Sequence, residues 1–464
     1  MLFSTYKFIF TFLPIVFLGY YIISNFLPNK YSKIWLILAS FYFYSQGSVK
    51  FFPIFVFTVF FNYFAGSVIC KSKGILRKIA LGISLAENIL LLGYFKYTNF
   101  FIENYNFFTG SSVLLKNIIL PIGISFFTFQ LIAYLVDCYR DKVENYSILD
   151  FLVFITFFPQ LIIGPIVHHK DIVPQVSDKS NKKLNLDNVI LGIFIFSVGC
   201  AKKTFLADPL TAYASQFFAN GGYGNMLDGW LSSISYTFSY YFDLSGYADM
   251  AIGLGYLFNI KLPQNFNSPY KQRNFRDYWR CWHMSLSRFL SDYVFRSVYH
   301  KGDGSKKFYF SVMVTFFVSG FWHGSGWTFV LWGIVNGILV CAAHFMARKK
   351  WKMPFFLAWC LTFLGVILTR VMFVSPNFTT MINAFKSLVT ITGVRSGLVN
   401  FVYNNLYTII LLATSAFICF FTKNTSQITE KFSPRLKYAV FAGFLLALSL
   451  FHMNSVTKFL YFQF

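Results

Sequence analysis

The chain has 464 residues, of which 56% are hydrophobic, 22% are aromatic and only 12% are charged. Soluble globular proteins carry about 25% charged residues, so this composition excludes a water-soluble surface for most of the chain and predicts a membrane protein. The net charge of +23 comes from lysines and arginines in short breaks between apolar runs, which is typical of cytoplasmic loops beside anionic lipid and excludes nucleic acid as a partner.

Apolar runs follow one another along the chain, and a membrane-spanning helix needs about 20 such residues. The first run has no small-residue cleavage site, so we expect a retained helix and not a signal peptide. Residues 34–44 form a shorter run, which we expect to pair with its neighbour as a hairpin. The sequence predicts roughly a dozen spans, at residues 8–27, 51–70, 79–94, 118–136, 151–167, 189–206, 231–257, 308–321, 327–345, 355–373, 407–421 and 438–451.

The basic residues between the first runs set the expected orientation. With the N-terminus outside, Lys30 and Lys33, the cluster at residues 71–78, and Arg140 with Lys142 can all fall on the cytoplasmic side. This requires that residues 34–44 dip into the membrane and return, and that one further short span or re-entrant segment lies between residues 95 and 117. The opposite orientation puts all three groups outside. We therefore expect a multi-pass protein with an extracytoplasmic N-terminus.

No long linker, low-complexity tract or repeat interrupts the chain, so residues 1–464 are expected to form a single integral membrane domain. The longest polar stretches are residues 168–188 and 261–304. The second is basic and aromatic, which suits either an amphipathic segment at the membrane interface or a solvated loop anchored by its aromatic residues. The seven cysteines are scattered without metal-ligand spacing, so no disulfide framework and no metal site are expected.

Two histidines have unusual surroundings. His283 follows Trp282 in the basic, aromatic stretch, and His323 follows Trp322 at the end of an apolar run. An ionisable group inside or beside a spanning segment is a functional candidate, because its burial costs free energy. Neutral imidazole suits a general base that deprotonates a hydroxyl attacking a thioester. Either histidine could instead be structural, capping a helix or bonding a carbonyl.

Glycines surround the second histidine, at Gly320, Gly324 and Gly326. They allow close approach either of a ligand or of a neighbouring helix.

Polar residues also interrupt two other apolar runs. Asp243 and Asp249 could orient a histidine, pair with an arginine of residues 271–280, or line a polar tunnel. A proton relay in a transporter is the alternative from a different functional class. Gln160, between Pro159 and Pro165, marks a broken span, which needs cover from protein or a cavity at membrane depth.

Six strings of residues, taken together and in order, resemble the membrane-bound O-acyltransferase family, in the branch of alginate and peptidoglycan O-acetyltransferases. They lie at residues 121–130, 158–166, 242–253, 265–270, 279–287 and 322–329.

The resemblance implies an all-α polytopic fold, with about a dozen or more helices around a transmembrane tunnel and a motif-bearing core at residues 118–333. It implies that His323 is the catalytic histidine and His283 a second functional histidine. The residues expected to line the tunnel or hold substrate are Asp243, Asp249, Trp282, Trp322, Gln160 and Asn267.

Residues 459–464 have the spacing Phe-x-Tyr-x-x-Phe. This resembles the C-terminal motif of a small partner peptide in teichoic-acid D-alanylation, and implies that Tyr461 carries the acyl group. In that hypothesis His323 deprotonates the Tyr461 hydroxyl, which attacks the thioester. A phenol has a pKa of about 10 and is easier to activate than a sugar hydroxyl. An aromatic belt that ends the last helix is the alternative.

The function implied is O-acetylation of an extracytoplasmic glycan, either peptidoglycan or an alginate-like exopolysaccharide. The acetyl group would come from a cytosolic thioester, with acetyl-CoA as the expected donor substrate and no bound cofactor, and would cross the bacterial inner membrane. A periplasmic acetyltransferase or esterase-like partner is expected to complete the transfer. The alternatives are D-alanyl transfer to teichoic acid and, in a different class, a polytopic transporter.

Overall fold

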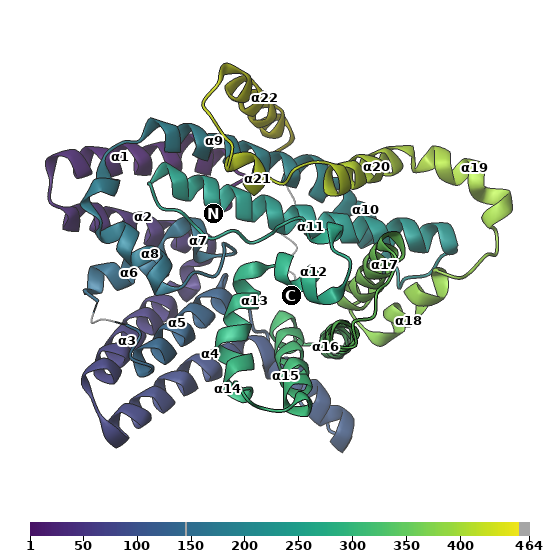
Figure 1. Cartoon of the computed structure of the whole chain (residues 1–464), viewed down its shortest axis with the longest axis horizontal. Coiled ribbons are helices and arrows are strands. Elements are labelled where there is room, and N and C mark those ends of the chain that lie inside the picture. The colour runs from purple at the N-terminus through teal and green to yellow at the C-terminus, as the bar shows by residue number, and fades with distance from the viewer. Residues whose placement is uncertain (144–145, 454–464) are drawn as a thin grey trace. The chain divides into compact units, whose positions relative to one another are not determined.

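The computed structural model describes residues 1–143 and 146–453, and all regular secondary structure within these ranges is helical (Figure 1). The hexapeptide predicted as an acyl-carrier motif, with Tyr461, lies outside the described residues. The chain forms two compact units, and helices α9 and α11 contribute residues to both. The sequence predicted that residues 1–464 form a single membrane domain, which would contain both units, and this stays a prediction.

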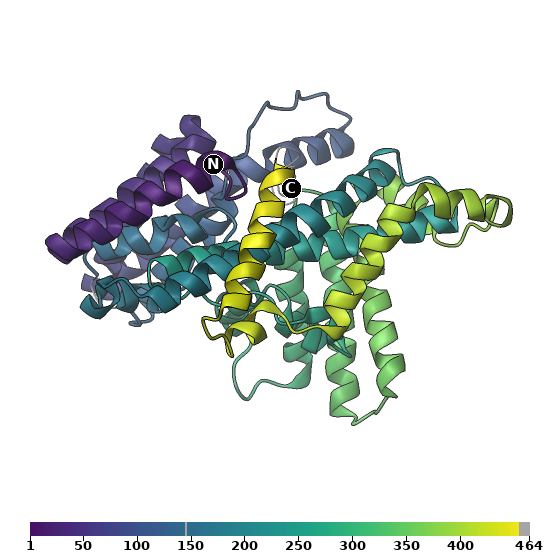
Figure 2. The same cartoon turned by 90° about the horizontal axis from the view of Figure 1, so that it is seen from above.

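The first unit contains residues Met1–Ser197, Ala248–Pro263 and Ser433–Met453. Neighbouring helices pack in pairs, with α1 against α2 and α3 against α4 (purple and blue in Figures 1 and 2). Its helices are η1 (Phe8–Phe12), α1 (Leu13–Phe26), α2 (Asn29–Ser48), η2 (Val49–Phe51), α3 (Phe52–Lys71), α4 (Gly74–Thr109), α5 (Ile124–Tyr139), α6 (Ile148–Thr156), α7 (Phe158–Leu161), α8 (His169–Ser177), η3 (Lys179–Lys182), α9 (Leu186–Ala201), the end of α11 (Met226–Leu257) and α22 (Leu436–His452).

Aromatic packing holds the start of this unit together. The rings of Phe8 and Phe12 lie 5.8 Å and 5.7 Å from Phe43, and Phe12 meets Phe158 edge-on at 5.3 Å. Edge-to-face pairs at these distances add to the gain from burying the rings. Some of the many phenylalanines of the sequence therefore lie in the core of this unit, while others lie on its surface.

The second unit contains residues Val198–Tyr247 and Gln264–Phe432. Helices α15, α16 and α17 pack in succession (green in Figures 1 and 2). Its helices are η4 (Lys202–Ala207), α10 (Asp208–Ala219), most of α11, η5 (Pro269–Lys271), α12 (Phe275–Cys281), α13 (Met284–Leu290), η6 (Ser291–Phe295), α14 (Arg296–Val298), α15 (Ser305–His323), α16 (Trp327–Arg348), α17 (Phe355–Val374), α18 (Phe378–Ser387), α19 (Val394–Asn404), α20 (Leu406–Phe421) and α21 (Thr425–Thr429).

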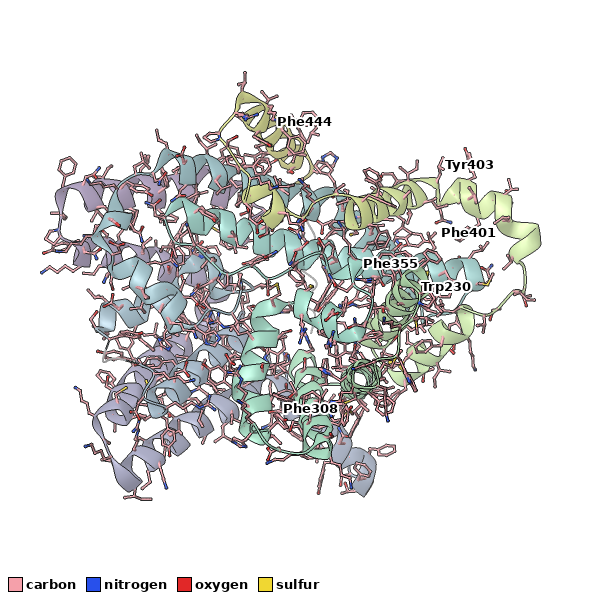
Figure 3. The ribbon with its side chains drawn as sticks, in the orientation of Figure 1. Trp230, Phe308, Phe355, Phe401, Tyr403 and Phe444 are labelled. Carbon is pink, nitrogen blue, oxygen red and sulfur yellow. The ribbon has the colours of Figure 1, made fainter. Side chains whose placement is uncertain are left out.

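Fewer helices meet the length and apolarity of a membrane span than the roughly dozen predicted. Among the described residues there are five, or six if the bent pair formed by α19 and α20 counts as one span. The other predicted runs lie in helices that are short, such as α5 with 16 residues, or that carry polar groups, such as α11 with its three aspartates. Large apolar side chains face outward, as lipid contact requires: Phe355 is 63% exposed and Tyr403 81% (Figure 3).

Glycine contacts set the distance between α15 and α16. A Cβ on Gly320 would lie 2.4 Å from the carbonyl oxygen of Phe329 and 3.0 Å from the Cα of Gly333. The Thr328 hydroxyl then donates to the carbonyl of Ser375, 3.1 Å away, and ties the start of α16 to the end of α17. The contacts of Gly320 thus hold the end of α15, where His323 lies, against α16, and the Thr328 hydrogen bond holds α16 against α17.

Candidate active site

His323 is the last residue of α15 and is buried among aromatic rings, with 4% of its surface exposed. Its imidazole lies 5.2 Å from the ring of Trp332 and 5.2 Å from that of Phe373, edge-on in each case. A Cβ on the following residue, Gly324, would come within 2.2 Å of the Phe329 ring, so only glycine leaves room for this packing. The imidazole therefore lies in an apolar setting where electrostatic interactions are strong.

His283 occupies a tight turn between α12 and α13, with φ 45° and ψ 54°, in the left-handed region. Asn265 holds this turn from the preceding loop. Its backbone carbonyl accepts from the Met284 amide at 2.9 Å, and its side-chain oxygen accepts from the Ser285 amide at 3.1 Å and hydroxyl at 2.9 Å. The strained backbone thus persists because neighbouring residues determine it, which is common at functional sites.

The His283 side chain is 3% exposed, and its Nδ1 has no hydrogen-bond partner among the described residues. Burial lowers the pKa of His283 from 6.5 to about 3, and the charge of Arg370 acts in the same direction. The imidazole is therefore neutral at physiological pH and suits a hydrogen bond to substrate better than a proton transfer.

Arg370, on α17, is a site residue that the sequence reasoning missed. It is 3% exposed, and its guanidinium carbon lies 4.3 Å from the Trp282 ring, 4.5 Å from that of Tyr240 and 5.6 Å from that of Phe373. Its Nη2 donates to the Tyr278 hydroxyl, 3.1 Å away. The sequence feature that could have indicated Arg370 is its position inside an apolar run long enough to span a membrane, where a charged residue is rare.

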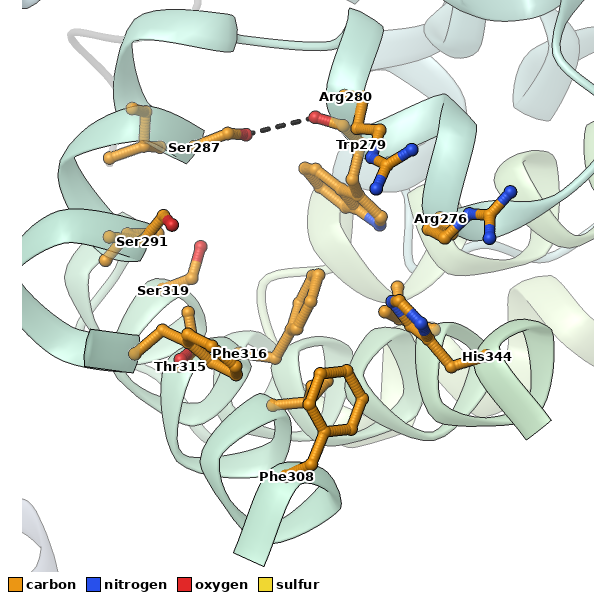
Figure 4. A pocket seen from close by; sticks show the side chains of 15 residues that line it. Arg276, Trp279, Arg280, Ser287, Ser291, Phe308, Thr315, Phe316, Ser319 and His344 are labelled. Atoms are coloured by element: carbon orange, nitrogen blue, oxygen red, sulfur yellow. Dashed lines mark hydrogen bonds between the residues drawn. The ribbon is translucent and has the colours of Figure 1, made fainter. Parts of the chain in front are cut away.

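A pocket of about 330 Å³ lies between α12, α13, α15 and α16 (Figure 4). Its wall includes Ser319, one helical turn before His323, and Leu286, within one turn of His283. The pocket therefore borders the helices that end or begin at the two histidines. The full lining is Arg276, Trp279, Arg280, Leu286, Ser287, Leu290, Ser291, Phe295, Phe308, Val312, Thr315, Phe316, Ser319, Val340 and His344.

The polar groups of the pocket wall lie on two sides, with arginines on one and hydroxyls on the other. In Figure 4 the guanidinium groups of Arg276 and Arg280 lie on one side and serine and threonine hydroxyls on the other. The Ser287 hydroxyl donates to the Trp279 carbonyl at 3.1 Å, shown by the dashed line. The Trp279 ring also meets Trp332 at 5.6 Å, and Trp332 in turn contacts the catalytic histidine candidate. Both guanidinium groups also pair with Asp277, at 3.1 Å from Arg276 and 3.5 Å from Arg280, so this end of the pocket carries one net positive charge. Most of the remaining wall is apolar.

Asp243, which the sequence offered as a partner of a histidine or arginine or as a tunnel residue, pairs with a lysine. The Nζ of Lys203 lies 2.5 Å from Asp243 and 2.8 Å from Asp208, and the lysine and Asp243 side chains are each 1% exposed. Burial of three charges together requires such mutual compensation. This cluster of Lys203, Asp208 and Asp243 joins η4 and the start of α10 to the middle of α11.

The remaining predicted residues divide between the units. In the second unit, the Trp322 ring lies 4.9 Å from that of His323. Asn267 donates its amide to the Cys281 carbonyl at 2.9 Å and accepts from the Asn424 side chain at 2.8 Å, so it supports the His283 turn. In the first unit, Gln160 is fully buried and donates to the Phe154 carbonyl at 2.6 Å, and Asp249 is half-buried on α11.

The family described as "MBOAT, membrane-bound O-acyltransferase family" matches residues 36–382, which include the pocket, both histidines and Arg370. A peptidoglycan O-acetyltransferase of Helicobacter pylori is 42% identical over 427 residues, covering 85% of this chain and 81% of that protein.

Two further relatives are more distant. The probable alginate O-acetylase AlgI of Pseudomonas aeruginosa is 36% identical over 391 residues, covering 81% of this chain and 72% of that protein. A teichoic acid D-alanyltransferase of Bacillus subtilis is 29% identical over 249 residues, covering 51% of this chain and 62% of that protein. The comparisons confirm the resemblance of the six motifs and decide against a transporter: the chain is an acyltransferase and belongs to the membrane-bound O-acyltransferase family.

Proposed function

We propose that this chain transfers acetyl groups from cytosolic acetyl-CoA across the bacterial inner membrane for O-acetylation of an extracytoplasmic glycan, with peptidoglycan as the favoured acceptor. The support is the similarity to a peptidoglycan O-acetyltransferase, which extends over 85% of the chain. Similarity to a D-alanyltransferase covers only 51%, so D-alanyl transfer is the less favoured reaction. The N-terminus would lie outside, as the basic loops require.

The observation that carries this proposal is the pocket between α12, α13, α15 and α16. Its volume is in the range of ligand sites, and its wall is apolar with a few polar groups. Arg276 and Arg280 suit the phosphates of a coenzyme-type donor, because guanidinium groups bind phosphate oxygens in pairs of hydrogen bonds. The apolar wall and the hydroxyls suit the donor's aliphatic and amide-containing arm, which would carry the thioester toward His323.

In the reaction His323 acts as general base. Its neutral imidazole takes the proton of the attacking hydroxyl, the hydroxyl oxygen forms a bond to the thioester carbonyl carbon, and the carbon–sulfur bond then breaks. The departing thiolate takes the proton back from the imidazolium. Positioned acid–base groups of this kind contribute about 10²- to 10⁴-fold to rates.

His283 has a different part, because its depressed pKa keeps the imidazole neutral. We assign it to positioning the acyl group or the attacking hydroxyl through the unpartnered Nδ1. Neutral imidazole has one donor and one acceptor nitrogen, so it can hold a hydroxyl or a carbonyl without competing for the transferred proton.

The attacking hydroxyl is proposed to be that of Tyr461. An acyl-tyrosine would then be discharged to the glycan by a periplasmic esterase-like partner. Intact-protein mass spectrometry after incubation with acetyl-CoA tests this step. A gain of about 42 Da, lost in Tyr461→Phe and in His323→Ala, is expected of a covalent relay. A gain that persists in Tyr461→Phe would place the acetyl group on another residue.

The function itself is tested by thiol release in proteoliposomes that contain the purified chain, with a muramyl glycan fragment and a periplasmic extract that supplies the partner on the opposite side of the membrane from the donor. Acetyl-CoA and a D-alanyl thioester are offered in parallel. The proposal predicts release from acetyl-CoA that falls at least 100-fold in His323→Ala and is unchanged in His300→Ala, where the histidine is exposed. Release from the D-alanyl thioester alone would overturn the acetyl assignment in favour of D-alanyl transfer.

A further inference from the structure

Arg370 is a buried cation that the mechanism above leaves without a role. It lies in the apolar helix α17, and no carboxylate of the described residues is within ion-pair distance of it. Removing a guanidinium from water without a counter-charge is costly, so such residues in spanning helices usually mark a functional site.

The surroundings of Arg370 compensate this cost only in part. The rings of Tyr240, Trp282 and Phe373 lie within cation–π distance, and the Tyr278 hydroxyl accepts one hydrogen bond. The guanidinium Nε, however, is buried and has no partner among the described residues. A strong donor is therefore held rigidly in place with no acceptor supplied by the described protein.

The position of Arg370 relates it to both histidines. Its guanidinium contacts Trp282, which precedes His283, and it shares Phe373 with His323 as a ring neighbour. The charge of Arg370 also contributes to the low pKa of His283, so the two side chains are within electrostatic range. The Nδ1 of His283 is likewise buried and has no partner among the described residues. Buried polar atoms are nearly always hydrogen-bonded, so these two unsatisfied atoms, which lie on either side of Trp282, indicate a polar ligand at this place.

We infer that Arg370 is a further catalytic residue, whose Nε–H donates to the carbonyl oxygen of the acyl group and stabilises the negative charge that this oxygen gains. The inference rests on the proposed acyl transfer. When the hydroxyl oxygen bonds to the carbonyl carbon, the carbonyl π electrons move to oxygen and the hydroxyl proton moves to His323. When the carbon–sulfur bond breaks, its electron pair leaves with sulfur, which takes that proton, and the carbonyl re-forms.

The aromatic enclosure suits this role. A fixed donor in a water-excluded site stabilises developing charge without reorganising, which is the usual origin of the largest part of enzymatic rate enhancement. No acidic side chain of the described residues pairs with the guanidinium, so none competes with the acyl oxygen for its N–H groups. Arginine also stays charged at any working pH.

The test compares Arg370→Met, Arg370→Ala and the control Arg348→Met, using thiol release from acetyl-CoA. Arg348 also lies over two rings, those of Phe308 and Tyr309, but is exposed. Methionine fills the space without charge, and replacing a buried ion by an apolar side chain is often neutral for stability. We expect Arg370→Met to lose about 100-fold or more in kcat with KM within about threefold and no lower melting temperature, and Arg348→Met to match wild type.

Chemical rescue separates an electrostatic role from a packing role. Guanidinium at non-denaturing concentration should raise the rate of Arg370→Ala at least tenfold and leave the wild type and His323→Ala unchanged. The inference is overturned if Arg370→Met keeps kcat within threefold, or if it loses activity together with melting temperature and guanidinium restores nothing. Failure of the proposed function would differ, because the wild type and Arg348→Met would then release no thiol either.

Discussion

At the scale of single residues, the two histidines of the site differ because of the atoms around them. His323 ends a helix among aromatic rings, whereas His283 caps the next helix in a left-handed turn with one nitrogen unpartnered. The sequence indicated both as candidates, since each is an ionisable group beside an apolar run. It could not indicate the turn, because the conformation of His283 depends on hydrogen bonds that Ser285 donates to Asn265, which lies eighteen positions before His283.

The buried, neutral state of His283 has a consequence for stability against pH. Its pKa in the folded chain is about 3, below the ordinary 6.5, so the unfolded chain binds the proton more tightly. This contribution to stability is complete above about pH 6.5 and is lost as pH falls from 6.5 towards 3. Asn does not titrate and tolerates the left-handed backbone.

We therefore expect the melting temperature in detergent to fall more steeply between pH 6.5 and 4.5 for the wild type than for His283→Asn, with the two nearly parallel above pH 7. Differential scanning fluorimetry over this range measures both curves. Parallel curves across the whole range would show that His283 is not buried in its neutral form.

Arg370 shows the limit of sequence reasoning at this scale. Arg370 only slightly lowers the hydropathy of its apolar run, and no residue next to it in the sequence is a partner that accounts for a buried charge. Its partners Tyr240, Tyr278 and Trp282 come from α11 and the α12–α13 turn. Only the packing of these elements against α17 brings them together, and a single sequence does not record that packing.

At the scale of elements, α15 and α16 are held by direct contact between their glycine backbones. The glycines near His323 were expected to allow close approach either of a ligand or of a helix, and Gly320 approaches α16. Gly320→Ala places a methyl group 2.4 Å from the Phe329 carbonyl oxygen, so the helices must separate. We expect a loss of about 1–3 kcal/mol in the free energy of unfolding and reduced activity, because His323 moves with its helix.

Gly82→Ala, on α4, is the matched control for this substitution. No atom lies within 4 Å of the Cβ position there, and alanine favours a helix interior over glycine. Its stability should equal or slightly exceed that of the wild type. Equal melting temperatures for Gly320→Ala and Gly82→Ala would contradict the account of α15–α16 packing.

The cluster of Lys203, Asp208 and Asp243 joins three other elements, η4, α10 and α11. Lys203→Met removes the ammonium group that lies between the two carboxylates, and removing one member of a buried ion pair typically costs about 3–5 kcal/mol. The neighbouring Lys202 bonds the Thr425 hydroxyl at 2.9 Å and is partly exposed, so Lys202→Met should cost about 1 kcal/mol or less.

Denaturation in mixed detergent measures both lysine variants. Adding Asp243→Asn to Lys203→Met should recover part of the loss, since one uncompensated charge is removed. If Lys203→Met unfolds at the same denaturant concentration as Lys202→Met, the cluster does not contribute to stability as its geometry indicates.

At the scale of the whole molecule, composition predicted a membrane protein, and six motifs predicted the family and with it the all-helical fold. These predictions are confirmed. The number of spans was harder to predict. The apolar run at residues 231–257 contains several buried serines and a buried aspartate, Asp243, which pairs with Lys203 inside the protein. Hydropathy alone therefore does not separate a lipid-crossing helix from one shielded by its neighbours. The acyl-tyrosine relay through Tyr461 stays a prediction.

The most direct test of acyl transfer by His323 is mass spectrometry of muropeptides from the native bacterium, with the chromosomal copy replaced by His323→Ala or by the control His300→Ala. The account predicts O-acetylated muropeptides at wild-type abundance with His300→Ala, and an at least 100-fold lower abundance with His323→Ala at equal amounts of the protein in the membrane. Wild-type O-acetylation in the His323→Ala strain would contradict it.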